Sequence, residues 1–448
     1  MSYIERQVDA VDEATRAAGL YLVHLVAVGL HTAQRGAGRT TSSPVACPLP
    51  ENTTWGRVYA LARSNSVEGL SWFGASTRDD VPDDVRKRWS ADADMTLWRR
   101  LQFDAERERV LAAVTAAGFS VLPLKGVLMA GYYPDPAMRS MADNDILYGR
   151  VEAIPAGDAD ALQTDEVPGG ALAEGFGSHG FRIAGATERD RERTVVASTA
   201  ELTRIMDGLG YRASHTEVGN ADCYEKAPCF NFEMHRILAE ARLSFSDYYR
   251  NPWLRARRDA PDSLHFHFAD EDEYLYHIAH AFKHYNSGGC GIRLLADEAV
   301  FLTAKSERMD WDYIARELDK LGMTDFEARV HAVADSLLRG DPAAVFDADR
   351  DTCEFLLFLL SSGVYGNRST RIAHRLEEFG AQDDGSALAH LRYLWWRVRL
   401  DDETLAQAHP WLTRHHVPLP IVLCYRMVRG LTMRFPAIFD EFRAIMRS

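Results

Sequence analysis

Cysteine is scarce in this chain, and this scarcity argues against a cross-linked fold. Six cysteines occur among 448 residues, with no Cys-x-x-Cys pair: Cys47, Cys223, Cys229, Cys290, Cys353 and Cys424. Disulfide-stabilised scaffolds are short and dense in cysteine. We therefore expect reduced thiols, mostly packed in the interior of a cytoplasmic protein.

The chain also lacks an excess of positive charge. Its formal net charge is −14 at pH 7. Nonspecific binding to nucleic-acid backbones relies on clustered lysine and arginine, which such a negative field disfavours. This balance favours a small molecule or a protein as the partner, although the local basic patch Arg255-x-Arg257-Arg258 leaves room for a structured RNA.

Long apolar runs and internal repeats are absent as well. The most apolar stretch near the N-terminus, Gly19–Leu30, is shorter than a bilayer requires and contains His24. An acidic segment from Asp9 to Glu13 precedes it, whereas an export signal begins with basic residues. We expect a cytoplasmic protein without a membrane span. Its hydrophobic fraction of 46% and charged fraction of 26% are those of a globular protein, and 448 residues are enough for two or three packed units.

Two aspartates separated by one residue form the most informative motif. Side chains of an extended segment alternate, so Asp143 and Asp145 project to the same side and Asn144 to the other. Neighbouring carboxylates repel each other, and a divalent cation between them relieves that cost. Solvated turn residues are the alternative, but the apolar pair Ile146-Leu147 directly after them favours a strand.

A second motif lies upstream of the aspartates. The apolar run Phe119–Leu124 predicts a strand that ends at Lys125-Gly126, and a short helical segment, Val127–Tyr133, follows. A glycine at a strand-to-helix turn lets backbone N–H groups approach a phosphate, and a lysine beside it can neutralise one. A solvated lysine at a strand end is the alternative. A phosphate cradle close to metal-binding carboxylates is typical of nucleotide chemistry.

A third acid follows later in the chain. The segment Cys229–His235 alternates strictly, with Asn231, Glu233 and His235 on its polar side. This pattern predicts a half-buried strand whose polar side faces a cleft. If this strand neighbours the aspartate strand in one sheet, Glu233 lies beside Asp143 and Asp145. A carboxylate on an exposed sheet face is the alternative.

Taken in order, these motifs resemble those of a known family. The matching residues are Leu124-Lys125-Gly126, Tyr133-Pro134-Asp135-Pro136, Arg139, Asp143-x-Asp145-Ile146-Leu147 and Glu233-x-His235, with a looser match from His409 to Gly430. The chain is similar to the uncharacterised bacterial nucleotidyltransferases of the DNA-polymerase-beta-like superfamily. Members of that superfamily usually have Gly-Gly or Gly-Ser at the phosphate turn, and Lys125-Gly126 departs from this pattern.

The resemblance implies both a fold and a reaction. The fold would be α+β, with a small mixed sheet flanked by helices. The reaction would transfer a nucleoside monophosphate from an NTP such as ATP to a hydroxyl of a small molecule or protein, with RNA as a further acceptor. Asp143, Asp145 and Glu233 would be catalytic and would hold two Mg²⁺ ions, or Mn²⁺, and Glu233 would also accept a proton. The residues expected to bind the nucleotide are Lys125, Gly126, Arg139, His235, His280, His284, Arg293 and Asp297.

Several alternatives stay open beside this interpretation. The chain could be a catalytically silent, nucleotide-binding regulatory module, or a toxin-like transferase that adds nucleotides to tRNA. Arg139 could pair locally with Asp135 instead of binding phosphate. Three domains are expected: a helical N-terminal cap (1–95), a nucleotidyltransferase core (96–262) and a helical C-terminal domain (263–448). Residues 149–198, rich in glycine, alanine and acids, would be an inserted flexible loop or lid.

A histidine stripe marks the predicted C-terminal domain. His277, His280 and His284 follow at spacings of three and four residues, which places them on one side of a helix. A zinc site, hydrogen-bonded interface histidines and a wall closing the nucleotide cleft are the three interpretations. Arg293 and Asp297, one turn apart on the next helix, would complete this polar cluster.

Overall fold

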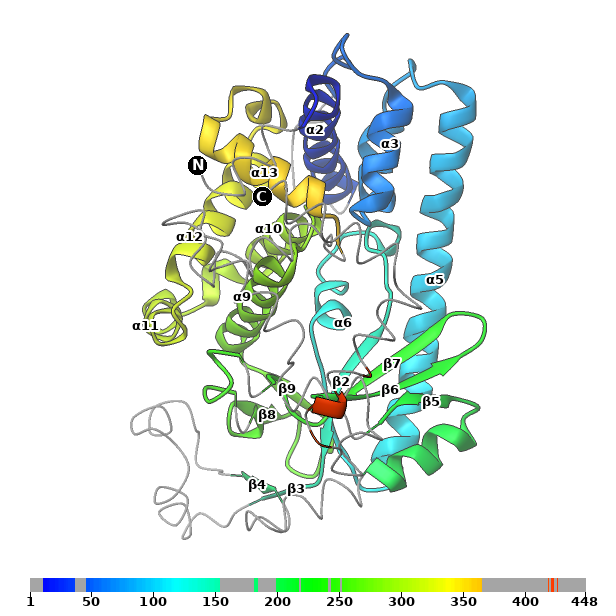
Figure 1. Cartoon of the computed structure of the whole chain (residues 1–448), viewed down its shortest axis with the longest axis vertical. Helices are drawn as coiled ribbons and strands as arrows, with labels where there is room; N and C mark the ends of the chain where they lie inside the picture. Colours follow the sequence, from blue (N-terminus) through cyan, green and yellow to red (C-terminus); the bar gives the residue numbers. More distant parts are fainter. Residues whose placement is uncertain are drawn as a thin grey trace.

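The computed structural model describes residues 11–36, 46–153, 181–183, 199–216, 219–240, 243–249 and 252–364, with residues 418, 420–422 and 425. N-terminal helices, a five-stranded sheet and further helices follow one another along the chain (Figure 1). This arrangement confirms the expected α+β fold with a small mixed sheet.

The described residues of the N-terminal part form the helices α2 (Glu13–Gly36), α3 (Trp55–Ser64), α4 (Glu68–Ala75) and α5 (Asp83–Ala116). The Thr54 side chain accepts a hydrogen bond from the N–H of Arg57 and so starts α3. The backbones of α2 and α4 touch, since a Cβ on Gly74 would lie 2.3 Å from the Leu25 carbonyl oxygen. Only glycine permits this approach.

The sheet has the strand order β1-β2-β7-β6-β5. Its strands are β1 (Ser120–Pro123), β2 (Asn144–Gly149), β5 (Arg212–His215), β6 (Ala221–Lys226) and β7 (Phe230–His235). β2 and β7 run parallel, and the other neighbouring pairs are antiparallel. The predicted adjacency of the aspartate strand and the Glu233 strand is therefore confirmed.

One face of this sheet is apolar and packed. Ile146 of β2 and Phe232 and Met234 of β7 are fully buried in one cluster with Phe103 and Val110 of α5. A helix over residues 199–208 contributes to the same cluster. In Figure 1, α5 runs from the helical end of the molecule down alongside the sheet. Because strand side chains alternate, this packing directs Asp145 and Glu233 to the opposite face.

Short elements connect the strands. The helix α6 (Gly126–Met129) and the 3₁₀ turn η1 (Pro136–Met138) lie between β1 and β2. Two small two-stranded sheets are formed by β3 (Val151–Ala153) with β4 (Phe181–Ile183), and by β8 (Ala256–Arg258) with β9 (Phe266–Phe268). A 3₁₀ turn, η3 (Pro252–Leu254), precedes β8. Within the predicted insertion 149–198, the structure describes residues 149–153 and 181–183. The rest of the insertion lies outside the described residues.

The second half of the described chain is helical. Its elements are α9 (Asp270–Ser287), α10 (Arg293–Lys305), η4 (Ser306–Arg308), α11 (Trp311–Leu321), α12 (Thr324–Val333), η5 (Ala334–Arg339), η6 (Pro342–Asp347) and α13 (Arg350–Ser362). Leu275 and Ile278 of α9 share a buried cluster with Leu122 of β1 and Leu147 of β2. α9 therefore packs against the face of the sheet that also carries the acids.

Two expectations from the sequence stay predictions. α5 runs through residue 95, the predicted end of the N-terminal cap, and the match near His409–Gly430 falls almost entirely outside the described residues.

Of the described helices, α2 is long and apolar enough by length and composition to cross a membrane. A core helix passes the same test, and 67% of the apolar 18-residue window within Glu13–Gln34 is buried inside the protein.

Candidate active site

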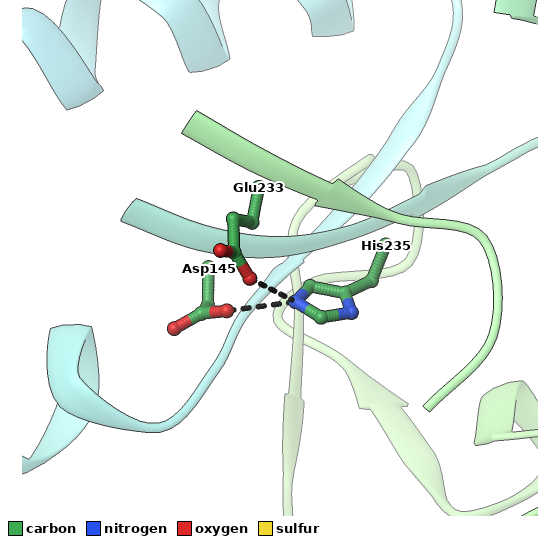
Figure 2. Close-up of side chains that lie close together, drawn as sticks. All are labelled: Asp145, Glu233 and His235. Carbon is green, nitrogen blue, oxygen red and sulfur yellow. Dashed lines mark hydrogen bonds and ion pairs between the residues drawn. The ribbon is translucent and has the colours of Figure 1, made fainter. Parts of the chain in front are cut away.

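The acidic residues meet where β2 and β7 run side by side. Asp145 lies directly opposite Glu233 in the register of these parallel strands, and Leu147 lies opposite His235. Paired positions on neighbouring strands point to the same face of a sheet. Figure 2 shows Asp145, Glu233 and His235 converging from the two strands. Asp145 is buried, whereas the Glu233 side chain is 33% exposed and accessible to a ligand.

Two donors hold the Asp145 carboxylate in place. Lys125 Nζ lies 2.6 Å and His235 Nε2 lies 2.7 Å from Asp145 Oδ1. On the other side of the ring, Asn220 Nδ2 lies 3.2 Å from His235 Nδ1. Since the Asn220 amide donates to Nδ1, His235 carries its proton on Nε2 and donates it to Asp145. Burial and the nearby Lys125 charge lower the pKa of His235 to about 4, so this imidazole is neutral at pH 7.

The site contains more negative than positive charge. Burial and the charge of Asp145 raise the pKa of Asp143 to about 6 and that of Glu233 to about 7. For Asp145, burial is outweighed by Lys125 and His235, which hold its pKa below the usual range. Three carboxylates thus share a buried region with Lys125. Further positive charge from a ligand would stabilise their ionised forms.

The turn after β1 has an unusual backbone. Lys125 has φ +50° and ψ −122°, a conformation that is strained for any residue with a side chain. This conformation brings its ammonium group to Asp145. A Cβ on Gly126 would lie 3.0 Å from Arg139 Nη1, so glycine leaves space for that guanidinium. Non-glycine residues with positive φ cluster at functional sites, and this one occurs at the predicted phosphate turn.

Arg139 is tied into a second cluster beside this turn. Its Nε and Nη2 donate to the two carboxylate oxygens of Asp297 at 2.8 and 3.0 Å, and Tyr133 Oη donates to Asp297 at 2.8 Å. The suggested local pair with Asp135 is wrong, since the Asp135 side chain instead accepts from the N–H of Ala137. The sequence could not reveal a partner 158 residues away.

Arg293 lies close to both clusters but is not bonded to either. It is the first residue of α10 and is half-buried. Its charge lowers the pKa of Asp143 and of Asp297, which places it near both carboxylates. Among the residues that the structure describes, none forms a hydrogen bond or ion pair with its guanidinium.

The histidine stripe on α9 divides into two parts. His280 and His284 contact each other, with their Nε2 atoms 3.0 Å apart. Burial and the Lys125 charge both lower the pKa of each, which places the pair near the acidic site. His277 points elsewhere, and its Nε2 lies 3.4 Å from Glu298 Oε2. Tyr276, one turn before His280, also lies near Lys125. The spacing of four residues between Tyr276 and His280 could have predicted that Tyr276 lies near the site. Asn220, which contacts His235, has no comparable signal in the sequence.

The acidic residues fit a divalent cation. Ligand atoms of Asp145, Glu233 and His235 all lie within 4.8 Å of one another, and they form the one such group of three within the described ranges. Asp143 lies close enough for its pKa to respond to Asp145, although it is outside this group. Carboxylate oxygens suit Mg²⁺ and Mn²⁺, whereas the His235 Nε2–H already donates to Asp145.

Comparison with known proteins agrees with this geometry. A family model described as "Uncharacterised nucleotidyltransferase" matches residues 51–157 and 196–339, which is more than half of the chain. The two matched segments include the Lys125 turn, both strands that carry the acids, and helices α9 and α10. No curated protein and no solved structure matches the chain. The chain belongs to the family of uncharacterised nucleotidyltransferases.

Proposed function

We propose that this protein is a metal-dependent enzyme that transfers a nucleoside monophosphate from an NTP to a hydroxyl group of a small molecule or a protein. Membership of the nucleotidyltransferase family supports an NTP as substrate. The observation that carries the proposal is the placement of Asp145 opposite Glu233, with Lys125 bound to Asp145. This arrangement concentrates acidic oxygens next to a strained turn suited to phosphate.

Asp143, Asp145 and Glu233 would hold the metal, as two Mg²⁺ ions or Mn²⁺ in their place. Bound there, the metal would act as a Lewis acid on the attacking hydroxyl and on the leaving phosphates. Lys125 and His235 fix the position of the Asp145 carboxylate through Oδ1. Because two protein donors already orient this group, little rearrangement is needed when the substrate arrives.

Glu233 is suited to accept the proton of the acceptor hydroxyl. Its side chain is the more exposed of the two paired acids, and burial raises its pKa to about 7. A base with a pKa near the working pH serves proton transfer well. The acceptor oxygen then forms a bond to the α-phosphorus, the bond from that phosphorus to the bridging oxygen breaks, and pyrophosphate leaves.

The remaining predicted residues would surround the nucleotide. Gly126 would let backbone N–H groups approach the phosphates, and His280 and His284 would form the wall of the nucleotide site on α9. Arg139 and Asp297 would support this region through their mutual pair. The reaction would take place in the cytoplasm. A small-molecule or protein acceptor agrees with the net charge of −14, which disfavours bulk nucleic acid.

Incubation with each of the four labelled NTPs and Mg²⁺ tests the proposal. The expected result is release of pyrophosphate, with the labelled monophosphate appearing on the protein or on a small molecule from a cell extract. Binding without pyrophosphate release would instead indicate a silent regulatory module. Extension of added tRNA would indicate the toxin-like transferase.

A further inference from the structure

The cations near the acidic site differ in whether the protein already neutralises them. Lys125 is paired with Asp145, and Arg139 is paired with Asp297 through two hydrogen bonds. Arg293 has no such partner among the described residues. Its positive charge is therefore the one in this group that the described protein leaves free to bind an anion.

The position of Arg293 makes this lack of a partner costly. Burial lowers the pKa of Arg293, and the neighbouring Arg139 cation lowers it further. α10 has no acidic residue in its first turn, where the helix dipole already adds positive potential. A partly desolvated guanidinium without a counter-charge is unfavourable unless a ligand supplies one.

Nearby acids do not supply this counter-charge by direct contact. The charge of Arg293 acts on Glu68, Asp143 and Asp297 without an ion pair to any of them. Glu68 Oε1 accepts instead from Ser140, and its buried Oε2 has no hydrogen bond. Carboxylates therefore lie near the Arg293 guanidinium, but none of those named accepts a hydrogen bond from its N–H groups.

Arg293 lies on the phosphate-turn side of the acids. Arg139 links the two places. Its Nη1 would lie 3.0 Å from a Cβ on Gly126, and its guanidinium is bonded to Asp297, which lies one turn after Arg293 on α10. Glu233, by contrast, belongs to β7, on the far side of β2 from β1 and its turn. An acceptor beside Glu233 and an NTP beside the turn would therefore approach from different sides.

We propose that Arg293 binds the β- and γ-phosphates of the NTP. This inference rests on the proposed function and deepens it, because it assigns the leaving pyrophosphate to one side chain. A guanidinium offers several N–H donors in a planar fork, which matches two oxygens of a polyphosphate. Arg293 holds those phosphates while the α-phosphorus lies at the carboxylates.

The test compares ligands with and without the terminal phosphates. Calorimetry measures binding of inorganic tripolyphosphate, ATP and AMP in the presence of Mg²⁺ to the wild type, Arg293→Gln and Arg293→Lys. Arg293→Gln should weaken tripolyphosphate and ATP by roughly tenfold to a hundredfold, because a charge-assisted hydrogen-bonded contact is lost. AMP affinity should change by less than about twofold. The affinities of Arg293→Lys for tripolyphosphate and ATP should lie between those of the wild type and Arg293→Gln. Lysine keeps the positive charge but lacks the planar fork of N–H donors.

Arg88→Gln is the matched control, because it removes one positive charge from an exposed position on α5. It should leave all three affinities unchanged. An equal loss of AMP and tripolyphosphate binding in Arg293→Gln, or no loss of either, would overturn the assignment. The thermal midpoint of Arg293→Gln should equal or exceed that of the wild type, and a large fall would instead give Arg293 a structural role.

Failure of the proposed function has a different signature. A wild type that binds neither ATP nor tripolyphosphate would remove the basis of both proposals. A wild type that binds both, with the Arg293-dependent difference, but releases no pyrophosphate would leave the role of Arg293 intact and refute only the transfer reaction.

Discussion

Two clusters of charge meet at the Lys125–Gly126 turn, and they differ in how well their charges are balanced. In the first, Arg139 and Asp297 neutralise each other through two hydrogen bonds, and Tyr133 donates a third. In the second, Asp143, Asp145 and Glu233 share a region with Lys125. The first cluster is complete within the protein, whereas the second has excess negative charge.

From this difference we attribute a structural role to the first cluster and propose a functional role for the second. A complete cluster stabilises the fold only while both partners remain, because either charge alone would be buried without compensation. An unbalanced cluster makes the apo protein less stable and becomes favourable when a cation binds. Four predictions follow this comparison, ordered from the largest expected effect on free energy to the smallest.

Breaking the balanced cluster should destabilise the fold most. Asp297→Ala leaves Arg139 buried without its partner, so the free energy of unfolding should fall by about 3–5 kcal/mol in urea denaturation. The double variant Arg139→Met with Asp297→Leu removes both charges and should recover most of that loss. Equal stability of the single variant and the wild type would mean that this pair does not support the fold.

Changing the unbalanced cluster should instead affect turnover. Glu233→Gln should lower the rate of pyrophosphate release by roughly two to three orders of magnitude, because the proposed metal ligand and proton acceptor is lost. Its unfolding free energy should not fall, since a negative charge facing Asp145 is removed. Glu225→Gln is the control. Glu225 is an exposed carboxylate on the neighbouring strand β6, and its side chain lies on the same face of the sheet as Glu233. A Glu233→Gln variant with wild-type turnover would contradict the catalytic assignment.

Metal removal should distinguish the clusters by stability. Mg²⁺ at about a hundredfold excess over its dissociation constant should add about 2.7 kcal/mol to the unfolding free energy of the wild type, measured against the same protein in EDTA. Asp145→Asn should lose this increment, whereas the Arg139→Met, Asp297→Leu double variant should keep it. A metal effect of the same size in Asp145→Asn would place the cation elsewhere.

His24 offers a smaller, pH-dependent example of a balanced polar group. Its Nδ1 donates to the Pro342 carbonyl at 2.7 Å, and its Nε2 accepts from the N–H of Cys47 at 2.8 Å. Burial lowers the pKa of His24 in the folded state, so the unfolded chain takes up a proton first as the pH falls below about 6.5. The stability that His24 contributes is therefore present above that pH and declines below it.

The comparison is made with His24→Gln. Its unfolding free energy should be lower than that of the wild type by about 1 kcal/mol at pH 8, and this difference should shrink towards pH 5. A difference that stays constant or grows as the pH falls would contradict the neutral form of His24.

Alternation along the strands made much of the site predictable. In Cys229–His235 it separated the buried Phe232 and Met234 from Glu233, and β7 covers nearly this range. The predicted strand Phe119–Leu124 contains β1, and the short helical segment predicted after the Lys125-Gly126 turn overlaps α6. Such features depend on neighbouring residues, so the sequence carries them directly.

Contacts between distant segments were not predictable in the same way. Arg139 and Asp297 were both expected near the nucleotide, but their mutual pair depends on how α10 packs beside the turn. Asn220 fixes the His235 ring from a loop that carries no motif. Arg293 has no bonded partner among the described residues, and this depends on the three-dimensional arrangement, which residue spacing does not encode.

The position of a bound metal tests the central claim most directly. Crystals grown with Mn²⁺ and a non-hydrolysable NTP would show the ion through its anomalous scattering. The account predicts a peak within coordination distance of carboxylate oxygens of both Asp145 and Glu233, with the α-phosphate beside it. A metal–nucleotide complex bound away from these two residues would contradict it.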